Sequence, residues 1–323
     1  MSQGDQGNRG TEKHFWDGFF ELLYDKSDLR VEEQASVHDW LRDAEPRMQE
    51  LNEPVFQAVV GGYHADRVAY GFLAGYQSAL RHSFDDLPSS GLVAFCVSEK
   101  GGAKPTAFKT HGVPQQGAVV INGKKTFVTC GDQADLLLVA YKASEQASGR
   151  PLINIAKVKA NAPGVAIENM PEMPFIPEVR RGSVLFNDVL VGDSNLYRGD
   201  CYLNYAKPFS ASEGYFIIAA VIAYLLRVAK DYDWPLNHVD ELISLLQFTV
   251  MLTKREPLDP QTIIAGNGLR QSLENFNKKT RDLWQLVGER DQSRWLRDGA
   301  ILFASDRSQQ IRLNKARAYY EQE

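Results

Sequence analysis

The sequence predicts an α+β multidomain protein, with an N-terminal helical domain at residues 1–90, an antiparallel β-barrel at 91–200 and a four-helix bundle at 201–323. Two observations carry this prediction. The length of 323 residues, 44% of them hydrophobic, supplies material for about two domains of ~150 residues and for a large core. The apolar residues follow a helical period in the first part, a period of two in the middle and a helical period again after Tyr202.

The N-terminal part is predicted to be helical from Thr11 to Ser83, because its apolar residues recur three and four positions apart. The stripes contain Phe15, Phe19, Leu22, Leu23, Val37, Trp40, Leu41, Met48 and Leu51. The run Val55–Leu80 is rich in Ala, Gly and aromatic residues, which predicts one helix packed on most of its sides. Turn residues at 85–90 end the helical pattern.

The middle part is predicted to form strands separated by Gly, Asn and Pro. The expected strands are Leu92–Val97, Ala118–Ile121, Thr126–Cys130, Asp135–Tyr141, Leu152–Val158, Val165–Glu168 and Ser183–Phe186. The dipeptide Asn122-Gly123 is a strong hairpin signal between two of them. No long helical pattern interrupts the strands, so an antiparallel barrel or sandwich of about 100 residues follows.

The C-terminal part is predicted to be a bundle, because short breaks between long helices favour antiparallel neighbours. The expected helices are Phe209–Lys230, Val239–Lys254, Thr262–Val287 and Ser293–Tyr320. Apolar residues from Phe216 to Leu226 nearly encircle the first of them. One bundle core cannot cover all of that surface, so we expect a homodimer or homotetramer formed through these helices.

The charge balance argues against a general nucleic-acid binder, because the formal net charge is −5. Residues 1–90 hold 16 acidic and 8 basic residues, so an anionic ligand belongs more naturally to the later part of the chain. Cys96, Cys130 and Cys201 have no C-x-x-C spacing, which favours buried, reduced thiols over a disulfide framework or a metal site. With no signal peptide and no apolar window long enough for a membrane span, we expect a cytoplasmic protein.

Four segments of the middle part resemble the acyl-CoA dehydrogenase family in order and spacing. Phe95–Ala103 is similar to the family's aromatic-x-Val-Thr-Glu strand and the loop that follows it. Ile121–Thr129 is similar to its Asn-Gly-x-Lys-x-(Trp/Phe)-Ile-Thr segment. Ala134–Val139 matches the next strand, and Arg181–Val191 matches the Phe-x-(Asp/Asn)-Val-x-Val signature. The family's helix–barrel–bundle order also agrees, so the resemblance covers about residues 30 to 320.

The resemblance implies FAD as the cofactor, with the flavin ring held by two neighbouring strands. Phe127 is expected to cover one face of the ring, and Thr129 to hydrogen-bond near its N5 atom. The alternative is that these are ordinary strand residues on a half-buried surface. The cofactor-binding residues implied by the resemblance are Phe95, Val97, Ser98, Phe127, Val128 and Thr129.

The chain also departs from the family pattern. Where the family loop has Gly-Ser-Asp, this chain has Ala103-Lys104-Pro105. Lys104 could bind the substrate near the CoA pyrophosphate, or CoA no longer binds there. The family's Arg-x-x-Phe-Gly-x-Pro stretch, which grips FAD across a subunit interface, is replaced by Asp231–Leu236 without an arginine. The Gln-x-x-Gly-Gly segment is not recognisable.

Glu213 is the candidate catalytic base, because it stands where one branch of the family has its glutamate, at the start of the first bundle helix. The alternative is an exposed first-turn carboxylate favoured by the helix dipole, with Ser210 or Ser212 as the N-cap. The family's other position for the base falls at Ala304–Ser308, which has no glutamate and leaves Asp306 as the next candidate.

The resemblance implies an oxidoreductase of fatty acid metabolism that removes an α-proton from an acyl-CoA and transfers hydride from Cβ to FAD. The first alternative is another flavin enzyme on the same scaffold, such as a monooxygenase or a nitroalkane-oxidase-like protein. The second is a degenerate, non-catalytic member that acts as a binding or assembly protein. The missing arginine stretch is the main support for this second alternative.

Overall fold

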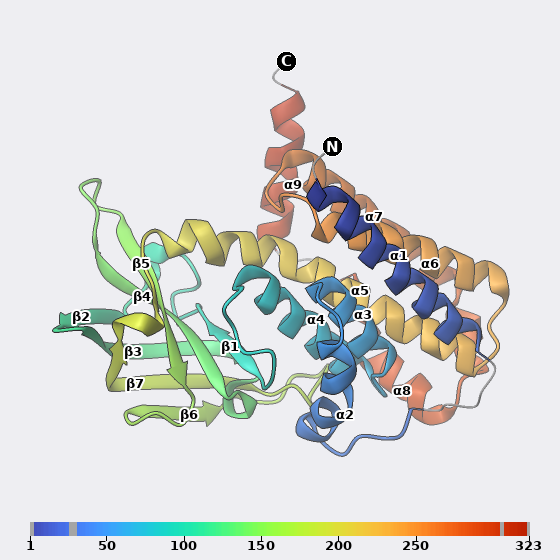
Figure 1. Cartoon of the computed structure of the whole chain (residues 1–323), viewed down its shortest axis with the longest axis horizontal. Helices are drawn as coiled ribbons and strands as arrows, with labels where there is room; N and C mark the ends of the chain where they lie inside the picture. The colour runs from blue at the N-terminus through green and yellow to red at the C-terminus, as the bar shows by residue number, and fades with distance from the viewer. Residues whose placement is uncertain (1–2, 26–30, 304–306, 322–323) are drawn as a thin grey trace.

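The computed structural model describes residues 3–25, 31–303 and 307–321. A twisted sheet occupies one end of the molecule and helices fill the other, with one long helix running from the sheet into the helical part (Figure 1). The main hydrophobic core lies among the helices and reaches the face of the sheet that they cover. A second core lies on the other side of the sheet.

The N-terminal helices are α1 Gln3–Tyr24, α2 Val37–Gln49, α3 Pro54–Tyr63 and α4 Val68–Ser83. The prediction of one helix over residues 55–80 is wrong, because the chain breaks between α3 and α4. In the break, Arg67 donates Nε–H and Nη2–H to the two carboxylate oxygens of Asp66, at 3.0 and 2.7 Å. Both side chains are buried. This ion pair, which also binds segments distant in sequence, overrides the local helical pattern.

The long helix α5 spans Lys207–Asp231 and follows a π-helical turn at Tyr202–Ala206. It packs against α3 and α4 at two close approaches. A Cβ on Gly62 would lie 2.0 Å from the carbonyl oxygen of Ala220, and one on Gly75 would lie 2.4 Å from Cα of Ile217. The segment Tyr202–Asp231 is long and apolar enough to cross a membrane, contrary to the expectation that no window is. Since 78% of its most apolar window is buried inside the protein, it is weak evidence for a span and has the burial of a core helix.

The strands form one sheet in the order β6-β7-β3-β2-β4-β5-β8, with β1 paired to β4. Their bounds are β1 Val93–Cys96, β2 His111–Gln115, β3 Ala118–Thr129, β4 Leu136–Glu145, β5 Pro151–Lys159, β6 Val165–Asn169, β7 Arg181–Gly192 and β8 Leu196–Tyr197. The prediction of an antiparallel barrel is correct only in part. Among the described strands, the edge strands β6 and β8 do not pair with each other, so the sheet stays open. In addition, β1 and β2 both run parallel to β4.

The hairpin predicted at Asn122-Gly123 is wrong, because both residues lie inside the single long strand β3. The hairpin joins β2 to β3 instead, and turns where Gly117 has φ +70°. The register of β3 shifts at Gly123, whose φ is +145° and whose added Cβ would lie 2.5 Å from Cα of Thr110. Asn122 exchanges two 2.9 Å hydrogen bonds with Asp188 on β7, so Gly123 serves a β-bulge and not a turn.

The C-terminal helices after α5 are α6 Leu236–Thr253, α7 Pro260–Lys279, α8 Glu289–Asp298 and α9 Arg307–Tyr320. The single helix predicted at Ser293–Tyr320 is therefore two helices. Packing pairs α9 with α7, whereas α8 contacts α4. Buried Asp298 explains the separation, because it accepts two hydrogen bonds from Arg297 and one from the backbone N–H of Ile176 near the sheet. These contacts hold α8 outside the predicted four-helix bundle.

Candidate functional site

The ends of β1 and β3 meet at one point of the sheet. The backbone N–H of Thr126 donates to the carbonyl of Ser98 at 2.9 Å, and Lys125 Nζ donates to the carbonyl of Val97 at 3.1 Å. Phe95 and Val97 belong to the core on the helical side. The structure therefore brings the candidate residues of the two strands together, although β1 forms its ladder with β4 and not with β3.

A buried ion pair fastens this junction. Lys125, which is fully buried, donates to Glu99 at 2.8 Å, and its ammonium lies 3.8 Å from the centre of the Phe108 ring. Burial lowers the pKa of Lys125 to about 8. Burial also opposes the charge of Glu99, but hydrogen bonds from Lys125 and from the backbone N–H groups of Lys109 and Thr110 bring its pKa below the ordinary value. No motif in the sequence indicates this pair, since Lys125 is one of two adjacent lysines that follow an expected turn.

Beyond the junction, β3 presents Phe127 and Thr129 at a second irregularity. The register shifts between Lys125 and Val128, and Phe127 has φ +57° with 53% of its surface exposed. Neither the Thr129 hydroxyl nor the nearby Ser98 hydroxyl has a hydrogen-bond partner within the described protein. The Arg181 guanidinium lies 5.6 Å from the centre of the Phe127 ring. The exposed ring of Phe127 thus has a cation against it, and Thr129 stands opposite that arginine in the ladder with β7.

Two other candidates stand apart from this surface. The side chain of Val128 is buried in the core on the far side of the sheet, so only its backbone is available to a ligand at the end of β3. Lys104 is exposed where the short 3₁₀ helix Pro105–Ala107 begins. Among the described residues its side chain has no hydrogen bond or ion pair.

Glu213 approaches the same region from α5. The backbone N–H of Phe95 on β1 donates to the hydroxyl of Tyr76 at 3.0 Å, and Tyr76 lies on α4. Burial raises the pKa of the Tyr76 phenol well above its ordinary value, and the charge of Glu213 adds to the rise. Phe209, four residues before Glu213 on α5, packs its ring against Phe95 of β1 and against Tyr76, so Glu213 lies one helical turn further along the same face. In the sequence Tyr76 is only one of many apolar residues in a buried helical run.

The predicted setting of Glu213 is wrong in one respect. Helix α5 begins at Lys207 and continues a π-helical turn, so Glu213 lies in the second turn and is half-buried. Neither expected serine acts as an N-cap, and the hydroxyl of Ser212 donates back to the carbonyl of Phe209 at 3.4 Å. The helix dipole acts chiefly within the first turn, so it has little effect on this carboxylate.

A wall of aromatic rings closes the helical side of β1. The ring centre of Phe95 lies 5.4 Å from that of Phe84 and 5.3 Å from that of Phe209, and Tyr76 lies 6.0 Å from Phe209. All four residues are at most 7% exposed. Behind these rings, α4 and α5 pack in direct backbone contact where Gly75 meets Ile217.

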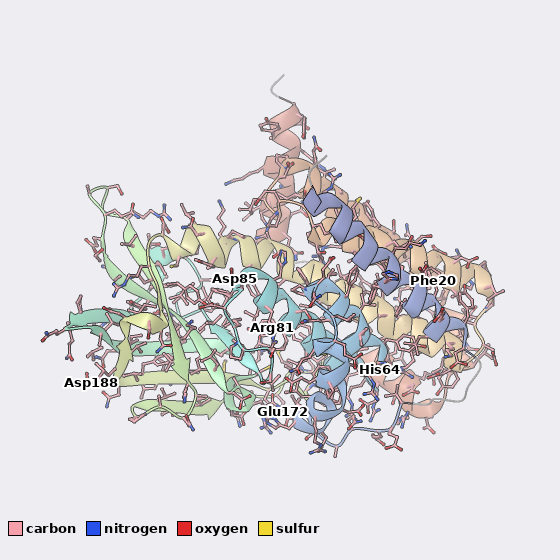
Figure 2. The ribbon with its side chains drawn as sticks, in the orientation of Figure 1. Phe20, His64, Arg81, Asp85, Glu172 and Asp188 are labelled. Atoms are coloured by element: carbon pink, nitrogen blue, oxygen red, sulfur yellow. The ribbon has the colours of Figure 1, made fainter. Side chains whose placement is uncertain are left out.

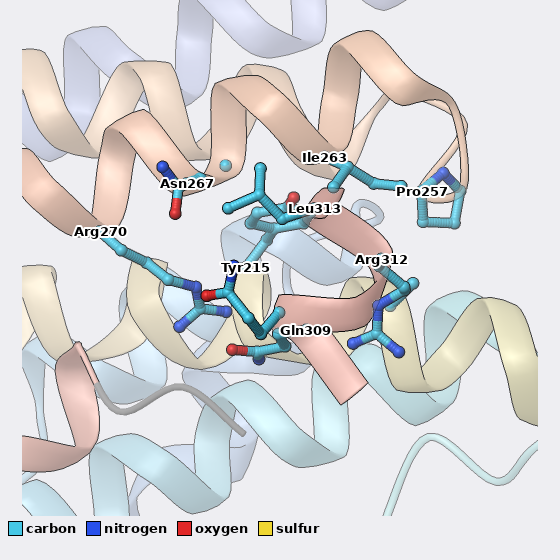
Figure 3. Close-up of a pocket in the computed structure, with 11 residues that line it drawn as sticks. Tyr215, Pro257, Ile263, Asn267, Arg270, Gln309, Arg312 and Leu313 are labelled. Atoms are coloured by element: carbon cyan, nitrogen blue, oxygen red, sulfur yellow. The ribbon is translucent and has the colours of Figure 1, made fainter. Parts of the chain in front are cut away.

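Several cavities lie away from this surface. One of about 70 Å³ is bounded by α5, α7 and α9, with Tyr215, Arg270 and Arg312 on its walls (Figure 3). Another of about 480 Å³ adjoins His64 and Lys230, near the opposite end of α5 from Glu213 (Figure 2). The first has the volume of a few water molecules.

The structure adds two findings on cysteines and metals. All three cysteines are free and buried, as predicted. Among the residues that the structure describes, no cluster of three or more His, Cys, Asp or Glu side chains could hold a metal ion. The expected assembly through the C-terminal helices stays a prediction.

Residues 94–189 match the family model of the acyl-CoA dehydrogenase middle domain. No curated protein sequence matches the chain. Among solved structures, the prolyl acyl carrier protein oxidase AnaB is 13% identical with a TM-score of 0.66, covering 94% of this chain and 97% of its own. PigA with FAD and proline is 12% identical with a TM-score of 0.65, covering 98% and 97%. A probable acyl CoA dehydrogenase from Mycobacterium abscessus is 15% identical with a TM-score of 0.60, covering 87% and 90%. Residues 94–189 thus resemble the acyl-CoA dehydrogenase middle domain, and the chain as a whole shares the fold of these solved structures.

Proposed function

We propose that this protein is an FAD-dependent oxidoreductase that oxidises the Cα–Cβ bond of an acyl thioester. One observation carries the proposal: the polar ends of β1 and β3 meet, and Glu213 lies one helical turn beyond Phe209, whose ring packs on Phe95 of β1. A base beside a surface suited to a flat redox cofactor is the arrangement that proton abstraction with hydride removal requires.

The surface at the end of β3 fits a flavin. Its rings are flat and apolar on their faces, with hydrogen-bonding atoms along one edge. Phe127 is exposed on the same strand as Thr129, next to Thr126, which bonds to Ser98, and the hydroxyls of Ser98 and Thr129 have no partner among the described residues. The Nε–H of Arg181 is buried without an acceptor. Ser98, Phe127 and Thr129 would hold the flavin, which when bound accepts the hydride that leaves the substrate.

Glu213 would take the α-proton of the substrate. Its place in the second turn of α5 keeps it beyond the main reach of the positive helix end, which would weaken it as a base. The phenol of Tyr76 keeps its proton, as tyrosine does at ordinary pH, and burial raises its pKa further. It would therefore fix the backbone of Phe95 without competing for the proton.

The aromatic rings on the helical side of β1 limit the size of the acyl group that the site could take. A long acyl chain next to Glu213 would have to pass between α4 and α5, where Phe209 and the close contact at Gly75 fill the space. We therefore propose a short or compact acyl group, on CoA or on a carrier protein. Solved neighbours described with proline or as a prolyl carrier protein oxidase are in keeping with a compact group.

The test begins with the purified protein and excess FAD. We expect a yellow complex whose colour is bleached by a short-chain acyl thioester. Glu213→Gln should keep the FAD content and lose ~10²–10⁴-fold in the rate of bleaching, the usual effect of a positioned base. Glu274→Gln, which removes an exposed carboxylate paired with Lys278 on α7, is the matched control and should be unchanged.

Each alternative has its own outcome. Protein that stays colourless supports the non-catalytic binding protein. A yellow protein that no thioester bleaches supports another flavin enzyme on this scaffold. Bleaching at the parent rate in Glu213→Gln would move the base to another carboxylate, with Asp306, outside the described residues, the next to replace.

A further inference from the structure

Two adjacent arginines at the start of β7 have opposite surroundings. Arg180 is exposed and forms an ion pair with Asp132, with Nε 3.0 Å from Oδ1 and Nη2 2.8 Å from Oδ2. Arg181 is half-buried, and among the described residues its only side-chain hydrogen bond goes to the sulfur of Met173. Its Nε–H is buried without an acceptor.

Burying the Arg181 guanidinium costs free energy, and no strong acceptor among the described residues offsets that cost. A thioether sulfur is a weak acceptor, and a guanidinium removed from water needs strong acceptors along its fork. Arg67 and Arg297 show the usual solution, since each donates Nε–H and Nη2–H to the two oxygens of a buried carboxylate. Burial lowers the pKa of Arg181, and no acidic group opposes that shift.

The position of Arg181 indicates which group could accept hydrogen bonds from its guanidinium. Arg181 stands opposite Thr129 in the β3–β7 ladder, and its guanidinium lies over the Phe127 ring. A cation–π contact of this kind is weaker than a bidentate, charged pair of hydrogen bonds. The cation therefore lies on the surface that we assign to the flavin, with no strong hydrogen-bond acceptor among the described residues.

We propose that Arg181 binds a phosphate oxyanion of the ligand that occupies this surface. The inference rests on the proposed function and extends it, because it supplies from within the chain a cation that the sequence lacks at Asp231–Leu236. Phosphate oxygens match the guanidinium fork that a carboxylate fills in Arg67 and Arg297. The phosphate belongs either to FAD or to the CoA or phosphopantetheine part of the substrate.

The experiment compares Arg181→Gln with Arg180→Gln by titrating FAD, riboflavin and CoA into apoprotein, with flavin fluorescence and calorimetry as readouts. If FAD supplies the phosphate, Arg181→Gln should bind FAD ~10–100-fold more weakly and riboflavin equally well, as expected for a lost charged hydrogen bond. If the substrate supplies it, FAD affinity stays and CoA affinity falls by that factor. Arg180→Gln should stay within about twofold of the parent, because its charge is exposed and already paired.

The proposal is overturned if Arg181→Gln binds both FAD and CoA like the parent. That result with normal flavin binding leaves the proposed function intact. A parent that binds no flavin but binds CoA through Arg181 removes the proposed function and supports the anion site. A parent that binds none of the three ligands overturns both.

Discussion

Replacing Lys125 by methionine should loosen the junction of β1 and β3 far more than the same change at Lys124. Methionine keeps most of the volume and the straight chain of lysine but removes the charge. In the parent, Lys125 joins Glu99 and the carbonyl of Val97 in a site closed to water. Lys124 pairs with Glu168 at 3.1 Å, but half or more of each side chain is exposed.

The magnitude follows from what each change leaves behind. Removing one partner of a buried ion pair costs ~3–5 kcal/mol, because the remaining charge is uncompensated. Glu99 keeps the backbone N–H groups of Lys109 and Thr110, at 2.7 and 3.1 Å, so we expect the lower end of that range. The exposed Lys124 pair contributes less than ~1 kcal/mol. Adding Glu99→Gln to Lys125→Met should recover part of the loss, since it removes the unpaired buried charge and the amide oxygen can still accept one of those two N–H groups.

The assay should report on the sheet itself. Hydrogen–deuterium exchange of peptides covering residues 92–100 and 118–130 follows this junction, and urea unfolding gives the global effect. We expect faster exchange in both peptides for Lys125→Met, near-parent exchange for Lys124→Met, and an intermediate value for the double variant. Equal exchange in the two single variants, or a double variant worse than Lys125→Met, would refute the reasoning.

Two further predictions concern the helices and acid stability. Gly75→Ala should destabilise the protein strongly, because the added Cβ would lie 2.4 Å from a backbone atom of α5. Gly71→Ala on the same helix has 3.8 Å of clearance and should be neutral or up to ~1 kcal/mol stabilising. Equal urea midpoints for the two variants would contradict this. The pKa of Glu178 lies below its ordinary value, because hydrogen bonds from Arg297 and Arg67 outweigh its burial. Its stabilising effect is therefore complete above the unfolded pKa of about 4.3 and is lost as pH falls below it, so Glu178→Gln should show a shallower decline in urea midpoint between about pH 5 and 3 than the parent.

The sequence predicted the middle strands well, because alternation of apolar and polar residues is a local signal. It failed at Asn122-Gly123 for a physical reason. The dipeptide favours a hairpin when only near neighbours are considered, but Asp188 and Thr110 supply the contacts that make it a bulge. The break between α3 and α4 was missed in the same way, since the Asp66–Arg67 pair interrupts an apolar pattern that continues through it.

The site shows the same division. Motif order brought the segment after β1 together with β3, where Thr126 bonds to Ser98, but β1 pairs with β4, and the roles of Ser98, Phe127 and Thr129 stay predictions. The buried partner of Glu99 and the unmatched cation at Arg181 carry no such motif. Their character depends on which side chains reach them from elsewhere, and that is decided only when the sheet and helices pack.

By itself the sequence determined the succession of helices, strands and helices, the resemblance of the middle segment and the reduced state of the cysteines, because spacing and residue type are properties of the chain. Only the tertiary structure decided that the sheet stays open, that α8 leaves the bundle, and that Phe209, one turn before Glu213, packs on Phe95 of β1. The reason is that these features depend on contacts between residues far apart along the chain. Local propensity is weak against the burial of charge and the packing of rings, which act only once those residues meet.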